Sequence, residues 1–456
     1  VEVDTTYTMS VELSVLESLG INLYSNAAAV LSELVANAYD ADADTVSITW
    51  QPRVPDDGTS TEEKLLEVVV TDDGCGMTAD QLNTRFLTAG YKKRDNEGNR
   101  SDKWKRPFMG RKGIGKLSVF SLARTVEVYS KVDGQAANGF KIVVSELEDA
   151  IRTPGGKYHP QPVEVPPAYD RNGTALVLSD LKSQRAGLTA AALRKRLARR
   201  FDVLDPRLPG AGGFHIIVNS KQITYADRQE LKKLQFIWEF GGETIPAEAL
   251  PKDIVRFALP RTYVDEEKGW RVKGWFGTTR KPTDLVDDDE AGSLKNIIVL
   301  ARKRPIQEGI IEKLDFSRLF GNYVTGQIEA DFLDLDDPSY DDISTSDIQR
   351  LIEDDDLVVK LQRFRRTSFV SAAEEWSAAR QSEGAKDALA NYPKLINWVD
   401  GLPDYQRTSA RKMIGTIASL DFEKGTEESD RRDLFRSGIL AFERVGLRKS
   451  TEQLDL

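Results

Sequence analysis

The strongest constraint on the fold is the change of hydrophobic period within residues 26–72. Residues 26–40, NAAAVLSELVANAYD, have apolar side chains three and four positions apart, which is the spacing of one face of an α-helix. Two strand-like runs follow, TVSITW (45–50) and LLEVVVTD (65–72), with a polar turn between them. A helix with one apolar face next to apolar strands packs in layers, so this region predicts a helix on a sheet.

The same kind of pattern continues to about residue 181. A short helix is predicted at 78–89, and the polar stretch 90–109 leads to a glycine-rich segment, GRKGIGK (110–116), which opens an apolar helix-like run to Ala123. Strand signals recur at VEVYS, FKIVVS and TALVLSD. These elements predict an α/β (α+β) domain of two layers and about 200 residues.

A chain of 456 residues exceeds one comfortable core and predicts two to three domains. A second mixed unit is expected from about residue 213, with strand candidates HIIVNS, RVKGWFG, NIIVLAR and TGQIEADF and an acidic loop at 287–290. From about 344 to the end, large apolar residues recur at helical spacing. We therefore predict three domains, 1–200, 201–343 and 344–456.

Composition excludes several classes of protein. A net charge of −10 argues against a surface that is basic throughout, and a single cysteine with two histidines leaves neither a disulfide nor a His/Cys zinc site. No apolar run approaches the length of a membrane span, so a cytoplasmic protein without membrane contact is expected. The chain begins at Val1 and ends in helix-like sequence, so we expect it to be a piece of a longer protein.

The helix 26–40 also carries polar residues on a second face. Glu33, Asn37 and Asp40 lie at positions i, i+4 and i+7, so they share that face. The Glu33 carboxylate could polarise a water molecule for attack on a phosphate, and the Asn37 amide could give an oxygen to Mg²⁺. The alternative is a solvated helix face, although asparagine is a weak helix former.

The segment VVVTDDGCGM (68–77) delivers Asp72 at the end of a strand, followed by Gly74 and Gly76. A carboxylate there can accept a hydrogen bond from the amine of adenine, and glycines let the backbone approach a flat base, with Met77 as an apolar wall. The alternative is a tight turn with an Asx cap. Cys75 is interpreted as a small core residue rather than a reactive thiol.

Two further glycine segments complete the set. GRKGIGK (110–116) exposes backbone N–H groups to an anion, with charge from Lys112 or Lys116, but it matches neither the P-loop nor the Rossmann pattern. In NGTALVLSDL (172–181), Gly173 lets Thr174 begin a strand with its hydroxyl available. Either segment alone is a glycine-rich turn.

ELVANAYDA, DDGCGM, GRKGIGK and NGT, in this order, resemble the N, G1, G2 and G3 boxes of the GHKL (Bergerat) ATPase family over residues 10–181. The resemblance implies a Bergerat α/β sandwich that binds ATP and Mg²⁺. It implies Glu33 as the general base, Asn37 as the Mg²⁺ ligand, Asp72 as the adenine anchor with Thr174 nearby, and 90–109 as a lid over ATP. The expected ATP-binding residues are Asn37, Asp40, Asp72, Gly74, Gly76, Met77, Gly110, Arg111, Lys112, Gly113, Ile114, Gly115, Lys116 and Thr174.

Within that family, the sensor histidine kinases are a poor match. They need a phospho-accepting histidine on a helical domain before the ATP domain, but only about 25 residues precede the first box, and both His159 and His215 follow it. Gyrase B subunits, MutL, MORC proteins and the Bergerat-type heat-shock chaperone instead carry a second α/β domain, the transducer, after the ATP domain. Residues from about 213 to 343 fit that place.

The transducer is expected to supply a cation to the γ-phosphate. ARKRPIQ (301–307) resembles a transducer segment and offers Lys303 and Arg304, while DDISTSDIQR (341–350) resembles the corresponding chaperone segment and offers Arg350. We take Glu33, Arg304 and Arg350 as the candidate catalytic residues. The alternative for each cation is a surface salt bridge.

The lid is unusually basic. Residues 92–116 hold ten lysines or arginines against three acids. DNA backbone, the acidic surface of a partner, the chain's own acidic runs at 334–342 and 353–356, and a solvated lid are four explanations that the sequence leaves open.

The resulting hypothesis is an Mg²⁺-dependent ATPase in which ATP drives lid closure and homodimerisation, with residues 1–25 crossing to the partner and 1–9 as an exchanged strap. The output could be DNA handling of the MORC or MutL kind, including bacterial defence. A chaperone-like module that binds a protein client and an ATP-binding regulator with negligible turnover are the alternatives.

Overall fold

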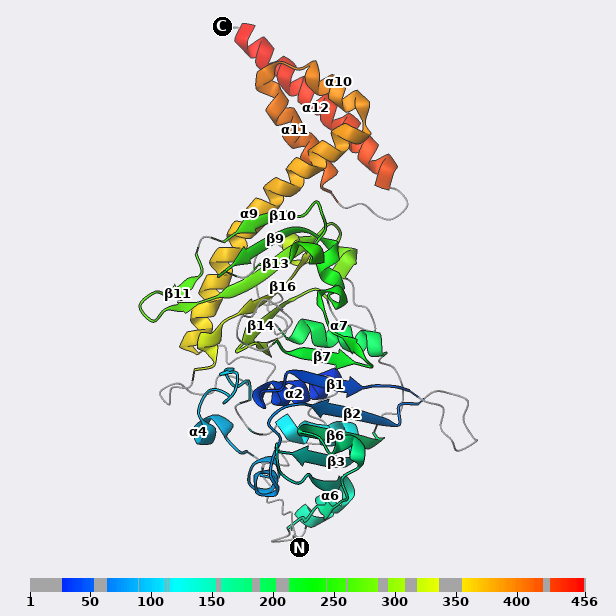
Figure 1. Cartoon of the computed structure of the whole chain (residues 1–456). Coiled ribbons are helices and arrows are strands. Elements are labelled where there is room, and N and C mark those ends of the chain that lie inside the picture. The colour runs from blue at the N-terminus through cyan, green and yellow to red at the C-terminus, as the bar shows by residue number, and fades with distance from the viewer. Residues whose placement is uncertain are drawn as a thin grey trace. The chain divides into compact units, whose positions relative to one another are not determined.

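The computed structural model describes residues 27–52, 64–88, 90–110, 113, 115–152, 157–182, 189–201, 213–242, 244–259, 261–285, 294–307, 318–335, 355–420 and 427–454. They belong to two compact units: one within Val1–Asp315 and Gly321–Phe364, the other within Phe316–Phe320 and Arg365–Leu456. Figure 1 shows the chain from the blue first helix to the red last helix.

The first unit begins with an eight-stranded sheet in the order β5-β4-β3-β6-β2-β1-β7-β8. Its strands are β1 (Thr45–Thr49), β2 (Glu67–Asp72), β3 (Ala123–Lys131), β4 (Asn138–Val143), β5 (Gln161–Pro162), β6 (Gly173–Leu181), β7 (His215–Val218) and β8 (Lys221–Gln222). The helices of this part are α2 (Ala27–Asp40), α3 (Ala79–Gln81), α4 (Lys93–Glu97), α5 (Val119–Leu122), α6 (Val144–Arg152) and α7 (Ala190–Arg200). The predicted helix at 26–40 and the strands of this region are confirmed.

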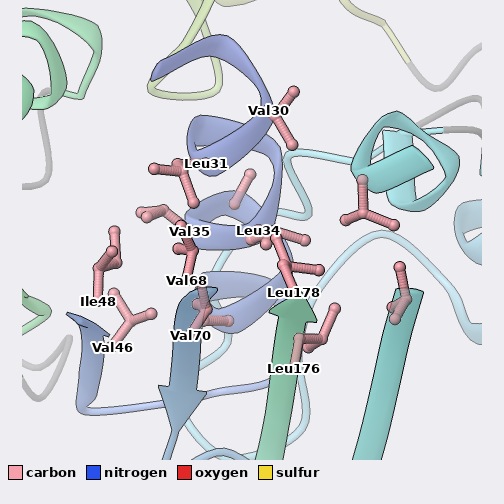
Figure 2. Packing of buried hydrophobic residues seen from close by; sticks show 14 of the residues in the cluster. Val30, Leu31, Leu34, Val35, Val46, Ile48, Val68, Val70, Leu176 and Leu178 are labelled. Atoms are coloured by element: carbon pink, nitrogen blue, oxygen red, sulfur yellow. The ribbon is translucent and has the colours of Figure 1, made fainter. Parts of the chain in front are cut away.

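Helix α2 packs its apolar stripe on one face of the sheet. Figure 2 shows Leu34 and Val35 on α2 next to labelled side chains of three strands, with Val30 and Leu31 farther along the helix. The labelled strand residues, which belong to the same core, are Val46, Ile48, Val68, Val70, Leu176 and Leu178. Side chains alternate across a strand, so Val68 and Val70 are buried against α2 while their neighbours face away. Each fully buried Val or Leu contributes roughly 1.5–3 kcal/mol. The predicted two-layer Bergerat sandwich, in which α2 packs on one face of the sheet, is therefore confirmed.

One strand lies in a different sheet from the one predicted. HIIVNS was expected to open the second domain, but β7 pairs in parallel with β1, from Thr45 with His215 to Ile48 with Val218. The reason is burial: Ile216 and Val218 join the core under α2, and the Asn219 side chain bonds both the N–H and the carbonyl of Trp50. The first sheet thus extends to Gln222, and the other predicted domain limits stay predictions.

A second, six-stranded sheet follows, in the order β10-β9-β13-β16-β14-β15, with a separate β11-β12 pair. Its strands are β9 (Leu234–Phe240), β10 (Val255–Ala258), β13 (Lys273–Thr279), β14 (Ile297–Ala301), β15 (Arg304–Gln307) and β16 (Val324–Glu329), and the separate pair is β11 (Tyr263–Asp265) with β12 (Trp270–Arg271). Three predicted strands are confirmed as β13, β14 and β16. Strand β9 was not predicted, although Trp238 at its centre is stacked between Phe257 and Phe276.

The C-terminal part is helical, as predicted. Its helices are α9 (Asp356–Asn391), α10 (Pro393–Asp400), α11 (Asp404–Ala418) and α12 (Glu427–Leu454), preceded by the short α8 (Arg318–Gly321). In the second unit these helices share a core of small and apolar residues, including Ala388, Val399, Ile414 and Phe435. The acidic run 287–290 lies outside the described residues. None of the described helices is long and apolar enough to cross a membrane.

Candidate functional site

A cavity of about 220 Å³ lies over the polar face of α2. It is lined by twelve of the residues that the sequence singled out: Glu33, Asn37, Asp40, Asp72, Gly76, Met77, Gly110, Gly113, Gly115, Lys116, Thr174 and Arg304. The structure therefore brings together residues from five separate segments that the sequence analysis singled out. Arg111, Lys112, Ile114 and Arg350 lie outside the described residues.

The three polar residues of α2 have different surroundings. Asn37 is exposed in the cavity, and its amide makes no hydrogen bond to another described residue. Asp40 is buried, and its two carboxylate oxygens accept the N–H groups of Met109 (2.8 Å) and Gly110 (2.9 Å). Burial raises the pKa of Asp40, against the opposing charge of Lys93. The Asn37 side chain is thus open to the cavity, whereas Asp40 holds the backbone at Met109 and Gly110.

Asp72, which also lines the cavity, ends β2. Its Oδ1 accepts the N–H of Gly74 at 2.9 Å, and Gly74 supports the carboxylate from behind without lining the cavity. Desolvation raises the pKa of Asp72 to about 6, against backbone hydrogen bonds from Gly74 and Thr174. At pH 7 the group is therefore a carboxylate and can accept a hydrogen bond from a ligand.

The sheet places Thr174 beside Asp72, because β2 pairs with β6 from Glu67 with Ser179 to Thr71 with Ala175. A residue that the sequence analysis missed, Ser130 on β3, joins this group. Its hydroxyl lies 3.0 Å from the Thr174 hydroxyl and accepts the N–H of Met77 at 2.9 Å. Ser130 is buried and does not line the cavity, so it supports Thr174 and Met77. The Asp72 carboxylate, the Thr174 hydroxyl and the apolar Met77 can hold a flat heterocycle by one edge.

Two glycines make this approach of backbone to backbone feasible. Gly76 has φ +64°, and a Cβ on it would overlap the Lys131 carbonyl. Gly173 has φ +110°, and a Cβ there would overlap the Asp72 carbonyl. Only glycine combines a positive φ with the absence of a side chain, so the predicted need for glycine at these turns has a physical cause.

Two of the described glycines of GRKGIGK lie against the polar face of α2. A Cβ on Gly115 would overlap the Glu33 carboxylate, and a Cβ on Gly110 would lie 3.1 Å from Asp40 Oδ2. The helix that follows is shorter than predicted, with one 3₁₀ turn at Gly115–Ser118 and one α-helical turn in α5. Backbone N–H groups at such a turn can bind an anion.

Lys116 lines the cavity, but its ammonium is used within the protein. It donates hydrogen bonds to the carbonyls of Arg85 and, at 2.7 Å, Thr88. Burial lowers the pKa of Lys116 to about 8. Two of its three ammonium N–H groups thus hold the end of the 82–88 turn, and the expected role of Lys116 toward a phosphate stays a prediction.

Much of the basic charge of the described lid is also internal. Lys93 donates to the Asp40 carbonyl (3.0 Å) and lies over the Phe108 ring, and Arg106 donates to the Ala43 carbonyl (2.6 Å). Arg94 pairs with Asp334, at the start of the acidic run 334–342. Among the four explanations of lid charge, the acidic run 334–342 thus accounts for one arginine, Arg94. Residues 336–342 of this run lie outside the described residues.

Arg304, from the start of β15, reaches the cavity beside α2. Its Nη1 donates to the Met109 carbonyl (3.1 Å), and its Nη2 lies 3.5 Å from Glu33 Oε1. Nη2 is buried and finds no hydrogen-bond acceptor among the described residues. Of the two cations predicted in 301–307, Arg304 therefore faces the cavity, while Lys303 belongs to the turn before it.

Several residues that line the cavity belong to no motif and were not predicted individually, because they lie only in the expected lid or just before it. Tyr91 donates to Glu97 Oε1 at 2.8 Å, and Arg85 pairs with the same oxygen at 3.0 Å. Phe86 and Lys93 also line the cavity. Cys75 is exposed there, so its interpretation as a core residue is wrong.

The donor set fits a nucleotide with a hard divalent cation. The lining offers the Asp72 carboxylate and the Thr174 hydroxyl for a base, and glycine backbone with the Arg304 guanidinium for phosphate oxygens. No cluster of three acids, histidines or cysteines that could hold a metal occurs in the described part of the chain. An Mg²⁺ ion would therefore take the Asn37 oxygen together with phosphate oxygens and water, which is its usual mode of binding.

Comparison with known proteins agrees with this geometry. Residues 24–164 match the model of a family described as histidine kinase-, DNA gyrase B- and HSP90-like ATPase. The chain is also 34% identical over 379 residues to a protein of Herpetosiphon aurantiacus named "Putative type II restriction enzyme HgiDII". That similarity covers 83% of this chain and 57% of the relative, so the chain spans little more than half of the relative's length.

Proposed function

The chain belongs to the GHKL ATPase family through residues 24–164, and we propose that it binds ATP with Mg²⁺ in the cavity under the lid and hydrolyses the γ-phosphate. The observation that carries the proposal is that one cavity is lined by two groups of polar residues, Asp72 with Thr174 and Glu33 with Arg304, and by Asn37 of the same helix as Glu33. Such a lining can take a ligand that has both a base and phosphates.

In this proposal Asp72 accepts a hydrogen bond from the exocyclic amine of adenine, and Thr174 and Met77 position the ring. Asn37 is the ligand for Mg²⁺, which when bound neutralises charge on the phosphate oxygens. The backbone of Gly110, Gly113 and Gly115 receives phosphate oxygens, and Arg111, Lys112 and Ile114 belong to the same loop.

Glu33 is the proposed general base. Its carboxylate lines the cavity 3.5 Å from the Arg304 guanidinium, where it could accept a proton from an attacking water. When a γ-phosphate is present, the free Nη2 donor of Arg304 has an acceptor, and Glu33 is released toward the water. Arg350 is kept as a second proposed cation.

ATP with Mg²⁺ is expected to raise the melting temperature of the chain, because a ligand that binds only the folded state stabilises it. Asp72→Asn is expected to remove most of this rise, since the amide presents N–H groups where the adenine amine needs an acceptor. Differential scanning fluorimetry measures both. Asp170→Asn is the matched control, because Asp170 pairs with Lys131 near the same sheet and lies outside the cavity lining. An equal rise in the Asp72 variant would contradict the assignment.

We further propose that the output of ATP hydrolysis is DNA handling in bacterial defence, in the cytoplasm. The name of the relative supports this choice over the chaperone-like alternative, and the remaining alternative is a regulator without turnover. Because the described lid uses much of its charge internally, the DNA contact is proposed outside the described lid. Binding to duplex DNA that weakens steeply with salt separates the first two functions, and a turnover assay separates the third.

ATP-driven dimerisation is proposed as the conformational step. A non-hydrolysable ATP analogue is expected to double the mass measured by light scattering, and ADP is not, because only the γ-phosphate reaches Arg304 and the closed form must be favoured by several kcal/mol. Deletion of residues 1–9, which lie outside the described residues, should abolish the doubling. A mass that is constant under all nucleotides would contradict the dimer and leave ATP binding intact.

A further inference from the structure

One carboxylate at the end of the second sheet contacts the lid. Asp334 follows β16 through a 3₁₀ turn at Asp331–Leu333. Its two carboxylate oxygens accept both arms of the Arg94 guanidinium, Nη1 at 2.7 Å and Nη2 at 2.8 Å. Arg94 lies in α4, is buried, and also donates to the carbonyls of Phe108 (2.8 Å) and Met109 (3.2 Å). This buried two-point pair therefore joins the first helix of the lid, the end of the lid and the second sheet.

The same segment holds the turn between β14 and β15. Arg302 and Lys303 form a two-residue turn in which both have positive φ, +50° and +65°, and such a turn needs support for residues other than glycine. Asp331 Oδ1 accepts the N–H of Arg302 at 2.7 Å, and Glu329 Oε1 accepts the N–H of Lys303 at 3.1 Å. The Arg302 Nε donates to the Asp334 carbonyl at 3.1 Å.

The turn leads directly to the cavity, because its next residue is Arg304. Arg304 Nη1 and Arg94 Nη2 both donate to the carbonyl of Met109, at 3.1 and 3.2 Å. The lid end, the turn and the guanidinium that faces Glu33 are thus joined by short contacts through one segment, residues 329–334. Neither Arg94 nor Asp334 is among the described residues that line the cavity.

We propose that Asp334 is a positioning residue that couples the position of the lid to the position of Arg304. When the lid moves, Arg94 either separates from Asp334 or moves it. Movement of Asp334 shifts the turn at Arg302 and Lys303, which determines the position of Arg304. The segment 329–334 therefore makes closure of the lid and placement of Arg304 one linked equilibrium. This proposal rests on the proposed ATPase function for its consequence, although the coupling itself exists without nucleotide.

Hydrogen exchange followed by mass spectrometry tests the coupling, because the N–H groups of Arg302 and Lys303 are bonded to carboxylates and report on the turn. Without nucleotide, Asp334→Asn is expected to speed exchange about tenfold in two peptides, the lid 90–110 and the hairpin 297–307. Glu239→Gln is the matched control, since Glu239 holds Arg256 by two contacts in the same sheet, away from the lid. It should leave both peptides unchanged.

With a non-hydrolysable ATP analogue and Mg²⁺, the wild-type lid and hairpin are expected to become protected together. In Asp334→Asn the lid should still respond while the hairpin response is lost, with the hydrolysis rate lowered about tenfold and ATP affinity within about threefold. Arg94→Lys, which keeps the charge and loses the fork, should give the same pattern and covers the case in which the Asp334 variant is unstable.

The outcomes separate the two proposals. A hairpin that responds to the analogue equally in wild type and both variants overturns the coupling, as does a nucleotide-free exchange rate that Asp334→Asn leaves unchanged. Loss of the hairpin response in Glu239→Gln also overturns it, because the effect would then follow from general destabilisation. A wild-type lid that ignores the analogue contradicts the ATPase function, and the nucleotide-free comparison still decides the coupling.

Discussion

Glu33→Ala is expected to lower the rate of ATP hydrolysis by about 10²–10⁴, the usual contribution of a positioned general base, and to keep ATP affinity within a few-fold. Glu33 lies one helical turn before Asn37, faces the cavity, and is held 3.5 Å from Arg304 by charge. Its loss removes the proton acceptor and leaves adenine recognition at Asp72 untouched. Single-turnover rates and equilibrium binding, measured on the same preparation, separate the two effects.

Asn37→Ala provides the contrast, since it removes the proposed Mg²⁺ ligand and should weaken Mg²⁺-dependent ATP binding itself. Glu33→Gln keeps the shape of the side chain and should be as slow as the alanine variant. Turnover that survives in both Glu33 variants would place the base elsewhere. A large loss of ATP affinity in them would make Glu33 a binding residue.

Gly76→Ala is expected to destabilise the first sheet by about 3 kcal/mol or more. Two penalties add: φ is +64°, and the new Cβ would overlap the Lys131 carbonyl, which is backbone of β3 and cannot turn aside. Exchange of the β3 amides, interpreted as the free energy of opening, measures the loss in this unit.

Gly134→Ala is the matched control for backbone conformation alone. Gly134 has a similar φ of +73°, but nothing lies within 4 Å of the position of its Cβ. Its substitution should therefore destabilise the protein by about 1 kcal/mol. Equal effects at both positions would mean that conformation, and not the close approach of two strands, explains the requirement for glycine at residue 76.

The sequence predicted those parts of the site in which local pattern and chemistry coincide. The helical spacing that buries Leu31 and Leu34 also places Glu33 and Asn37 on the polar face of α2. One periodicity therefore determines both the core residues and the residues of α2 that line the cavity. Likewise, Val68 and Val70 set the alternation of β2, and the strand end then brings Asp72 to the cavity. The resemblance to the family added the roles of these residues.

What the sequence could not predict depends on contacts across long separations. In the sequence, Lys303 and Arg304 are adjacent cations that no local signal distinguishes. The turn at Arg302 and Lys303, both with positive φ and both bonded to carboxylates, determines that Arg304 faces the cavity. The hydrogen bonds of Lys116 could not be predicted either, because their acceptors, the carbonyls of residues 85 and 88, belong to another segment. The strand β7 appeared to start a new domain, because its pairing with β1 has no local signal.

The pairing of β7 with β1 has a consequence for how the ATP-binding part acquires its structure. The edge of β1 is completed by residues about 170 positions later in the chain, so this contact forms late and through a long loop closure. A fragment that ends at residue 164, where the family match ends, or at 181 would leave β1 as an open strand edge, ready to pair with other chains. Expression of residues 24–222 supplies the missing strand and keeps α2 together with every strand of this sheet.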